Sequence, residues 1–121
     1  MRRDRPTFGG GLGVYIRDNI AYKRLYDLDC NAIENMWIEV ATCEGKLLIC
    51  NVYRPPNFTE FWDYLEANDE HVKSETAVKQ ILILGDLNAD FGTLQGKKLQ
   101  TFCDIHNFIP LIKDPTRITP D

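Results

Sequence analysis

The stretch Ile81-Leu82-Ile83-Leu84-Gly85-Asp86-Leu87-Asn88 decides how this sequence is interpreted. Its four apolar residues predict a buried β-strand that ends at Gly85. The strand delivers a carboxylate and an amide to its carboxyl end, where open α/β sheets commonly bind ligands. If the chain stays extended, Asp86 and Asn88 point to the same side. Such a pair can fix and deprotonate water or contact a metal or phosphate oxygen, but the same residues also form plain turns.

A second apolar run covers residues 47–53 and predicts a strand covered on both faces. It stops at Arg54-Pro55-Pro56, because proline has no N–H to donate to a sheet. Tyr53 and Arg54 could bind a phosphate there, the arginine through a bidentate contact. The alternative is an aromatic side chain at the end of a sheet beside a solvated arginine.

The remaining pattern alternates strands with helices, which indicates an α/β domain. A turn at residues 44–46 predicts a hairpin between strands. Two amphipathic helices are expected, the first weak near Asn68. The expected strands lie at residues 14–17, 22–25, 36–40, 47–53, 81–84 and 108–112, and the expected helices at residues 59–78 and 97–107.

Composition sets the broad class. The 121 residues are 44% hydrophobic and 26% charged, a globular balance that allows one domain at most. No apolar run has the roughly 18 to 20 residues that a membrane span requires, and the charged start is followed by glycines, so no signal peptide is expected. We therefore expect a soluble, intracellular chain with no membrane partner. The net charge of −4 argues mildly against a stand-alone nucleic-acid binder but is compatible with a nuclease.

The cysteines and histidines do not indicate a site. Cys30, Cys43, Cys50 and Cys103 form neither the close pairs of a zinc site nor a dense disulfide framework. Cys50 and Cys103 lie on apolar patterns, where cysteine acts as a small hydrophobe. His71 and His106 fall in the expected helices, which favours structural histidines at or near the surface.

Five segments together resemble a known family. They occur in the order and approximate spacing found in the endonuclease domains of non-LTR (LINE-type) retrotransposons, within the endonuclease/exonuclease/phosphatase (DNase I-like) superfamily. The resemblance extends from about residue 3 to residue 120. The segments are GGGLGVYIRDNI, ENMWIEV, LLICNVYRPPN, ILILGDLNADF and DPTRITP.

The resemblance implies a four-layered α/β sandwich and Mg²⁺-dependent hydrolysis of phosphodiesters, with DNA nicked so that a reverse transcriptase domain of the same polyprotein can extend the new end. Tyr53 matches the tyrosine that contacts the scissile phosphate. Asp86 matches the aspartate that orients or deprotonates water, and Asn88 the asparagine that helps hold phosphate and water. Leu87 replaces the usual phenylalanine. Thr116 and Arg117 match a segment near the DNA-binding face.

The resemblance also implies that residues 1–121 are a partial domain, and therefore an incomplete sandwich. The amino-terminal strands with the metal-binding glutamate and the carboxyl-terminal strand with an aspartate-histidine pair are not found in this sequence. Metal stabilisation is worth several kcal/mol, and a positioned acid or base about 10² to 10⁴ in rate. We therefore expect an inactive fragment. If the parent element is eukaryotic, an implied nicking role places the parent protein in the nucleus.

Two alternatives remain. The chain could be a non-catalytic remnant of the fold that binds nucleic acid or protein, as its acidic balance suggests. It could also belong to another phosphodiesterase or phosphatase branch of the superfamily. The Tyr-Arg-Pro-Pro and Pro-Thr-Arg segments favour the retrotransposon branch over the latter.

Overall fold

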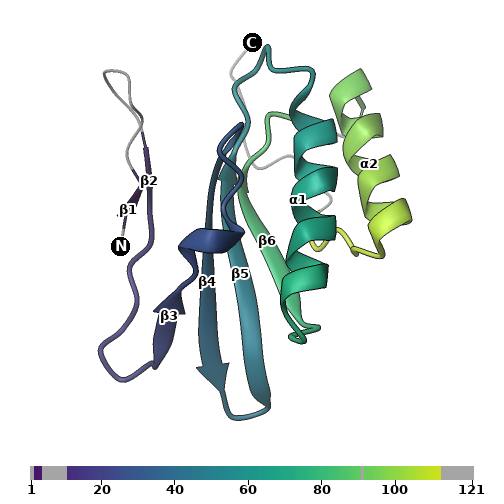
Figure 1. Cartoon of the computed structure of the whole chain (residues 1–121). Helices are drawn as coiled ribbons and strands as arrows, with labels where there is room; N and C mark the ends of the chain where they lie inside the picture. The colour runs from purple at the N-terminus through teal and green to yellow at the C-terminus, as the bar shows by residue number, and fades with distance from the viewer. Residues whose placement is uncertain (1, 4–10, 91, 113–121) are drawn as a thin grey trace. The chain divides into compact units, whose positions relative to one another are not determined.

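The computed structural model describes residues 2–3, 11–90 and 92–112. Two compact units make up the chain, Met1–Leu87 and Asn88–Asp121 (Figure 1). The first contains a two-stranded and a four-stranded sheet, and the second contains a single described helix. The secondary structure is mixed α/β, as the sequence predicted.

A four-stranded sheet forms the body of the first unit, with strand order β3-β4-β5-β6. β3 and β4 pair antiparallel, as do β4 and β5, whereas β5 and β6 are parallel. The helix α1 supplies the crossover that a parallel pair requires. The elements of this unit are β1 (Arg2–Arg3), β2 (Leu12–Gly13), β3 (Tyr22–Arg24), the 3-10 helix η1 (Tyr26–Leu28), β4 (Glu34–Thr42), β5 (Gly45–Tyr53), α1 (Phe61–Glu75) and β6 (Ile81–Asp86).

The hairpin between β4 and β5 forms at the predicted turn. Gly45 has a φ of +127°, a conformation that a residue without a Cβ adopts at little cost. The hydroxyl of Thr42 donates to the Gly45 carbonyl at 2.6 Å and accepts from the Glu44 amide at 3.2 Å. These bonds satisfy the backbone at the tip and set the register of the two longest strands.

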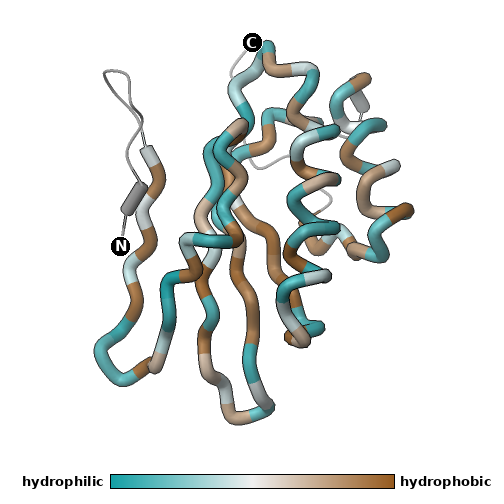
Figure 2. Tube along the Cα trace, in the orientation of Figure 1, coloured by the Kyte–Doolittle hydropathy of each residue, from teal (hydrophilic) through white to brown (hydrophobic). Residues whose placement is uncertain are grey.

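Burial along β5 corrects one prediction. Leu48, Cys50 and Val52 are completely buried, while Ile49 and Asn51 between them and Tyr53 after them are only half-buried. The apolar run therefore forms the expected strand, but in the described part of the chain only one of its faces is fully covered. β6 is likewise apolar along most of its length (Figure 2) without being deeply buried.

The helix α1 covers the face of the sheet that carries Cys50. It buries Phe61, Leu65 and Val72, whose spacing follows the helical repeat. The weak middle of the predicted helix is explained by Asn68, which points into the core rather than to solvent. Its carboxamide oxygen accepts from the Asn35 side chain at 2.7 Å and the Trp37 indole at 2.9 Å, and its amide donates to the Leu28 carbonyl at 2.7 Å.

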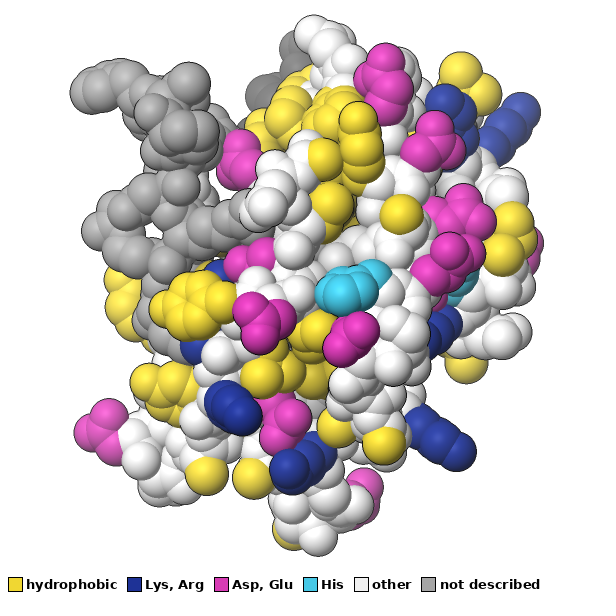
Figure 3. Space-filling view, viewed as in Figure 1, with side chains coloured by type: hydrophobic (Ala, Val, Ile, Leu, Met, Phe, Trp, Pro, Cys, Tyr) yellow, Lys and Arg dark blue, Asp and Glu magenta, His cyan; other side chains and the backbone are white. Residues whose placement is uncertain are grey.

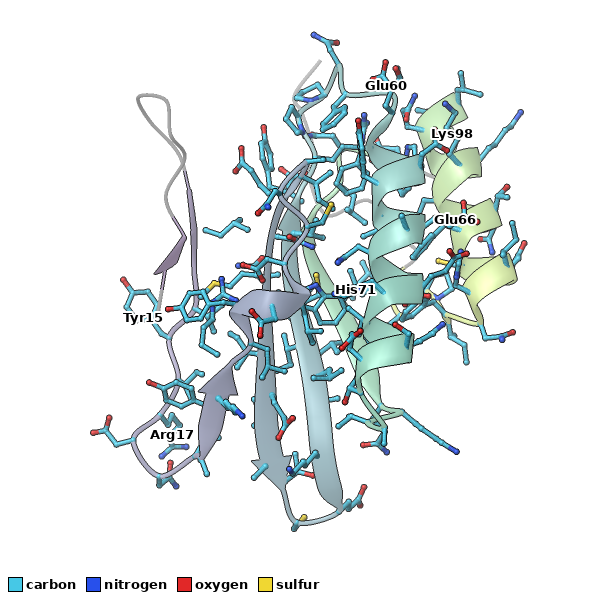
Figure 4. All side chains as sticks on the ribbon, viewed as in Figure 1. Tyr15, Arg17, Glu60, Glu66, His71 and Lys98 are labelled. Carbon is cyan, nitrogen blue, oxygen red and sulfur yellow. The ribbon has the colours of Figure 1, made fainter. Side chains whose placement is uncertain are left out.

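The loop through η1 is fixed to β4 by a second polar cluster. Arg24 binds Asp29 through two hydrogen bonds of 2.9 and 2.6 Å, with both side chains largely buried. Asp29 also accepts from the backbone amide of Trp37 at 3.2 Å. His71 of α1 lies with Nε2 3.2 Å from the Asp27 carbonyl oxygen (Figure 4). Its exposed position in a helix confirms that His71 lies at the surface, as predicted, and its structural role stays a prediction.

The second unit contains α2 (Leu94–His106), which confirms the predicted second helix and begins three residues earlier. The earlier start is explained by Thr93, whose hydroxyl accepts from the Gly96 amide at 3.2 Å and caps the helix. Asn107 ends it in the left-handed conformation. The ring of Phe102 stacks on Phe108 with centres 5.5 Å apart, and His106 is half-buried.

Two predicted strands are wrong. Residues 14–17 form no strand, and the pairing at this end involves β2 two residues earlier. Residues 108–112 follow α2 without any strand pairing. Both segments are rich in apolar residues, but a strand also requires pairing with a neighbouring strand, and neither segment is paired in this way among the described residues.

Two expectations from composition can be compared with the structure. The helices among the described residues are too short or too polar to cross a membrane. All four cysteines are free, with Cys50 and Cys103 buried as predicted and Cys43 exposed. Burial raises the pKa of the Cys50 and Cys103 thiols, so both remain protonated hydrophobic side chains at neutral pH.

Candidate functional site

The parallel pairing of β5 and β6 brings Tyr53 and Asp86 together. The two residues are register partners at the carboxyl ends of adjacent strands. Strands in a sheet lie about 4.8 Å apart, so these side chains stand next to each other. The ladder continues one step further, because the Arg54 amide donates to the Asp86 carbonyl at 2.9 Å. Residues 33 positions apart in the sequence thus form one edge of the sheet.

Tyr53 and Asp86 lie on the face of the sheet opposite α1. Asn35 and Trp37 bond to Asn68 of α1, so their side chains mark the helix-covered face. Asn35 pairs with Val52, and side chains alternate between faces along a strand. Tyr53 and its partner Asp86 therefore point to the other face. Asp86 is exposed and Tyr53 half-buried, so the pair is accessible from solvent.

Gly85 allows this arrangement. It has a φ of +138° and lies directly against the backbone of Val52. A Cβ at this position would overlap the Val52 carbonyl oxygen and lie 2.9 Å from its carbonyl carbon. The glycine before the aspartate is thus required where β6 approaches β5, immediately before the residue that carries the carboxylate.

Arg54 is buried instead of facing a ligand. Its side chain is 1% exposed, and the guanidinium carbon lies 5.8 Å from the centre of the Trp62 ring. Nε donates to the Leu87 carbonyl at 2.7 Å, and Nη1 donates to the carbonyls of Phe58 at 3.0 Å and Pro56 at 3.3 Å. Burial lowers the pKa of Arg54, and the negative charge of Asp86 opposes that change.

These contacts give Arg54 a structural position. One guanidinium joins the loop after β5 to the residue after β6, so it fixes the two segments that carry Tyr53 and Asp86. Sequence reasoning offered a phosphate contact or a solvated arginine, and the buried position matches neither. The burial depends on carbonyl acceptors from both segments, which the linear sequence does not reveal.

The remaining predicted site residues follow β6 in the sequence. Asn88 begins the second unit and has a φ of +47°, so the chain does not stay extended beyond β6 as the same-side expectation required. Asparagine tolerates this left-handed conformation better than most residues. Thr116 and Arg117 lie outside the described residues.

Two residues that the sequence analysis did not single out share the face with Tyr53. Glu34 is its register partner on β4, so Glu34, Tyr53 and Asp86 form one row across three strands. Asn51 lies two residues before Tyr53, and its side-chain amide donates to the Gly13 carbonyl at 3.3 Å. The strand pairing, which the sequence alone does not specify, is what brings these residues to the site.

The described residues contain no group of three or more histidine, cysteine, aspartate or glutamate side chains arranged to hold a metal ion. Asp86 is a carboxylate of the kind Mg²⁺ prefers, but in the described part of the chain it does not belong to such a group. These residues alone therefore do not fit a complete magnesium site.

The fold has a counterpart in a solved structure. The chain is similar to the endonuclease domain of TRAS1, a telomere-specific non-LTR retrotransposon, with a TM-score of 0.60 and 14% sequence identity. The likeness is one of fold. It covers 73% of this chain and 42% of that domain, so the chain spans less than half the length of its structural counterpart. No protein-family model and no curated protein sequence matches the chain.

The comparison supports the predicted fold class. The four-stranded sheet and two helices resemble part of an endonuclease fold and fit an incomplete α/β sandwich. Similarity at this level of identity concerns the architecture and assigns no activity.

Proposed function

We propose that this chain is part of a phosphodiesterase domain that nicks DNA for a non-LTR retrotransposon. The observation that carries the proposal is the register pair of Tyr53 and Asp86 at the carboxyl ends of parallel strands, on an accessible sheet face. A similar fold in a retrotransposon endonuclease supports it. The parent protein would then act on chromosomal DNA in the nucleus, together with a reverse transcriptase domain.

The proposed roles follow from the chemistry of the side chains. A phosphodiester presents negatively charged oxygens, to which the Tyr53 hydroxyl and the Asn88 amide can donate hydrogen bonds. The Asp86 carboxylate can orient a water molecule and accept its proton as the water attacks phosphorus. Arg54 fixes the segment that follows Asp86 by donating a hydrogen bond to the backbone carbonyl of Leu87. Thr116 and Arg117 are proposed to contact DNA.

Mg²⁺ is also part of the proposal, as the cofactor of the parent domain. Such an ion would supply charge stabilisation to the phosphoryl oxygens. Because the described residues gather no three metal-binding side chains, no step is assigned through the ion. We propose that the 121-residue chain alone does not nick DNA.

The face of the sheet that carries Tyr53 is the proposed DNA side. Figure 3 shows Asp and Glu side chains spread over the face that carries α1. Exposed members on this helix include Asp63, Glu70 and Glu75, which would repel phosphates. Tyr53 and Asp86 lie on the opposite face of the sheet, away from these charges.

A plasmid-nicking assay with Mg²⁺ tests the catalytic part. The chain is compared with Asp86→Ala and with Asp63→Ala, an exposed carboxylate on α1 that serves as the matched control. We expect no nicking from any of the three. Nicking that is lost only in Asp86→Ala would contradict the proposed inactivity and support the role of Asp86. Nicking retained in Asp86→Ala would contradict that role.

An NMR titration with a short DNA duplex at low salt tests the binding part. We expect the largest shifts at Tyr53, Asp86 and Asn88, and weaker binding by Tyr53→Phe than by Tyr64→Phe. Tyr64 is a partly exposed tyrosine on α1 and provides the control. Shifts confined to other surfaces would contradict the proposal.

A non-catalytic binding role is the second candidate. It is favoured by the net charge of −4 and by the exposed carboxylates of α1, which suit a protein partner better than DNA. A folded, monodisperse chain that neither nicks plasmid nor responds to the duplex would support this candidate over the endonuclease.

A further inference from the structure

Glu34 occupies a place at the candidate site that its sequence context does not indicate. It is the first residue of β4, and its register partner on β5 is Tyr53. Tyr53 in turn pairs with Asp86 of β6. The tyrosine therefore stands in the middle of a row, with one carboxylate on each neighbouring strand.

The three side chains share one face of the sheet. Asn35, the next residue along β4, bonds to Asn68 of α1 and so points toward the helix. Glu34 must point to the opposite face, where Tyr53 and Asp86 also lie. Glu34 is half-buried, whereas Asp86 is exposed. The row thus runs from a sheltered carboxylate to one that solvent reaches.

We infer that Glu34 is a positioning residue for Tyr53. Directly opposed residues of an antiparallel pair have Cβ atoms about 4.5 to 5.5 Å apart, within reach of a hydrogen bond between a glutamate and a phenol. The Glu34 carboxylate accepts a hydrogen bond from the Tyr53 hydroxyl and thereby fixes the orientation of the phenol ring beside Asp86. This inference rests on the proposed function for its meaning, but the contact itself does not depend on it.

The contact has a consequence for ligand binding. A phenol has a single O–H donor, so Glu34 and a phosphate oxygen compete for the same hydrogen. Binding of a phosphodiester transfers this hydrogen bond from Glu34 to the phosphate. The negative charge of Glu34 also opposes the charge of the phosphate. Neutralising Glu34 while keeping its shape should therefore strengthen binding, whereas loss of a purely structural residue would weaken it.

The first test follows the phenol directly, with tyrosine labelled at the ring carbon that bears the hydroxyl. The chain has five tyrosines, and Tyr53→Phe identifies the relevant NMR signal. We expect Glu34→Ala to shift this signal more than the other four. Glu39→Ala is the matched control, because Glu39 lies on the same strand but faces the opposite side and pairs with Lys46 at 3.1 Å. Glu39→Ala should leave the chemical shift of the Tyr53 signal unchanged.

The second test measures affinity for a short DNA duplex. We expect Glu34→Gln to lower the Kd severalfold and Glu39→Gln to lower it less. Should Glu34→Ala fail to fold, Glu34→Gln still reports on Tyr53, since an amide oxygen is a weaker acceptor than a carboxylate. If the chemical shift of Tyr53 is unchanged in both Glu34 variants, the inference is overturned. A Tyr53 signal that responds while no variant binds DNA supports the positioning role and contradicts the proposed function.

Discussion

Gly85 and Val52 are in such close backbone contact that β6 accepts no side chain at position 85. An added Cβ would overlap the Val52 carbonyl oxygen, and the φ of +138° already disfavours other residues. This contact lies one residue before Asp86, at the point where the ladder brings Asp86 beside Tyr53. The geometry of the candidate site and the stability of the sheet therefore depend on the same glycine.

Gly85→Ala should destabilise the chain strongly. Overpacking typically costs about 1 to 3 kcal/mol, and an unfavourable positive φ about 1 to 2 kcal/mol more. We expect a loss of about 3 kcal/mol in the free energy of unfolding, measured by urea denaturation. Gly45→Ala is the control, because Gly45 has a φ of +127° but no atom within 4 Å of the added Cβ. Equal losses in the two variants would contradict the close contact.

Arg54→Met should also be destabilising, because it removes the buried guanidinium that donates to the Leu87 and Phe58 carbonyls. Leaving buried acceptors unsatisfied costs about 1 to 3 kcal/mol each, so we expect a loss of about 3 kcal/mol in urea denaturation. Arg54→Lys should restore little, since an ammonium cannot span three carbonyls as a guanidinium does. Arg17→Met, at an exposed arginine before β3 (Figure 4), should change stability by less than about 0.5 kcal/mol. A loss in Arg54→Met as small as this control would contradict the buried role.

Asn68→Ala should break the polar contact between α1 and the sheet. It leaves the Trp37 indole, the Asn35 amide and the Leu28 carbonyl without their bonds to Asn68. We expect about 3 kcal/mol of destabilisation, with a shift of the Trp37 indole N–H signal in NMR spectra. Glu70→Ala, an exposed position on the same helix, should affect neither. An unchanged indole signal in Asn68→Ala would rule out the contact.

Stability should fall at alkaline pH because of Cys50. Burial raises the pKa of this thiol in the folded chain, while the pKa of the unfolded thiol is about 8.5. Above that pH the unfolded state releases a proton that the folded state keeps, so unfolding becomes more favourable as pH rises. We expect a loss of about 1.4 kcal/mol per pH unit above about pH 8.5. The loss in the free energy of unfolding is measured from urea denaturation at pH 7.5 and at pH 9.5.

Cys50→Ala provides the control for this pH dependence. The variant should be less stable at pH 7.5 but should lose less on going to pH 9.5. The remaining slope is expected from Cys103, whose pKa burial also raises. An alkaline loss as steep in Cys50→Ala as in the parent chain would show that other groups cause it.

The parts of the fold that depend on local pattern were predictable from sequence. The hairpin at residues 44–46, the strands around it and both helices follow from turn residues and apolar spacing. The segment at residues 14–17 was not, since its composition suits a strand but no described neighbour pairs with it. The polar interior of α1 escaped prediction as well, because Asn68 is buried by partners from η1 and β4 that are distant in the sequence.

In the candidate site, too, some residues could be predicted from local sequence pattern and others depend on contacts made only in the folded chain. Tyr53 and Asp86 could be named because each follows an apolar strand, and the resemblance in motif order added their proposed roles. The burial of Arg54 depends on carbonyls from two separate loops, which no linear pattern reveals. Glu34 could enter only through strand register, a property of the folded sheet.

The tight fit at Gly85 also has a meaning at the level of the gene. Every amino acid except glycine has a Cβ, so every missense change of codon 85 places an atom against Val52. Every missense substitution at this codon therefore destabilises the sheet, whereas synonymous substitutions do not. Among diverged copies of this sequence, retention of glycine at codon 85 would therefore mark copies in which selection still maintains a folded product.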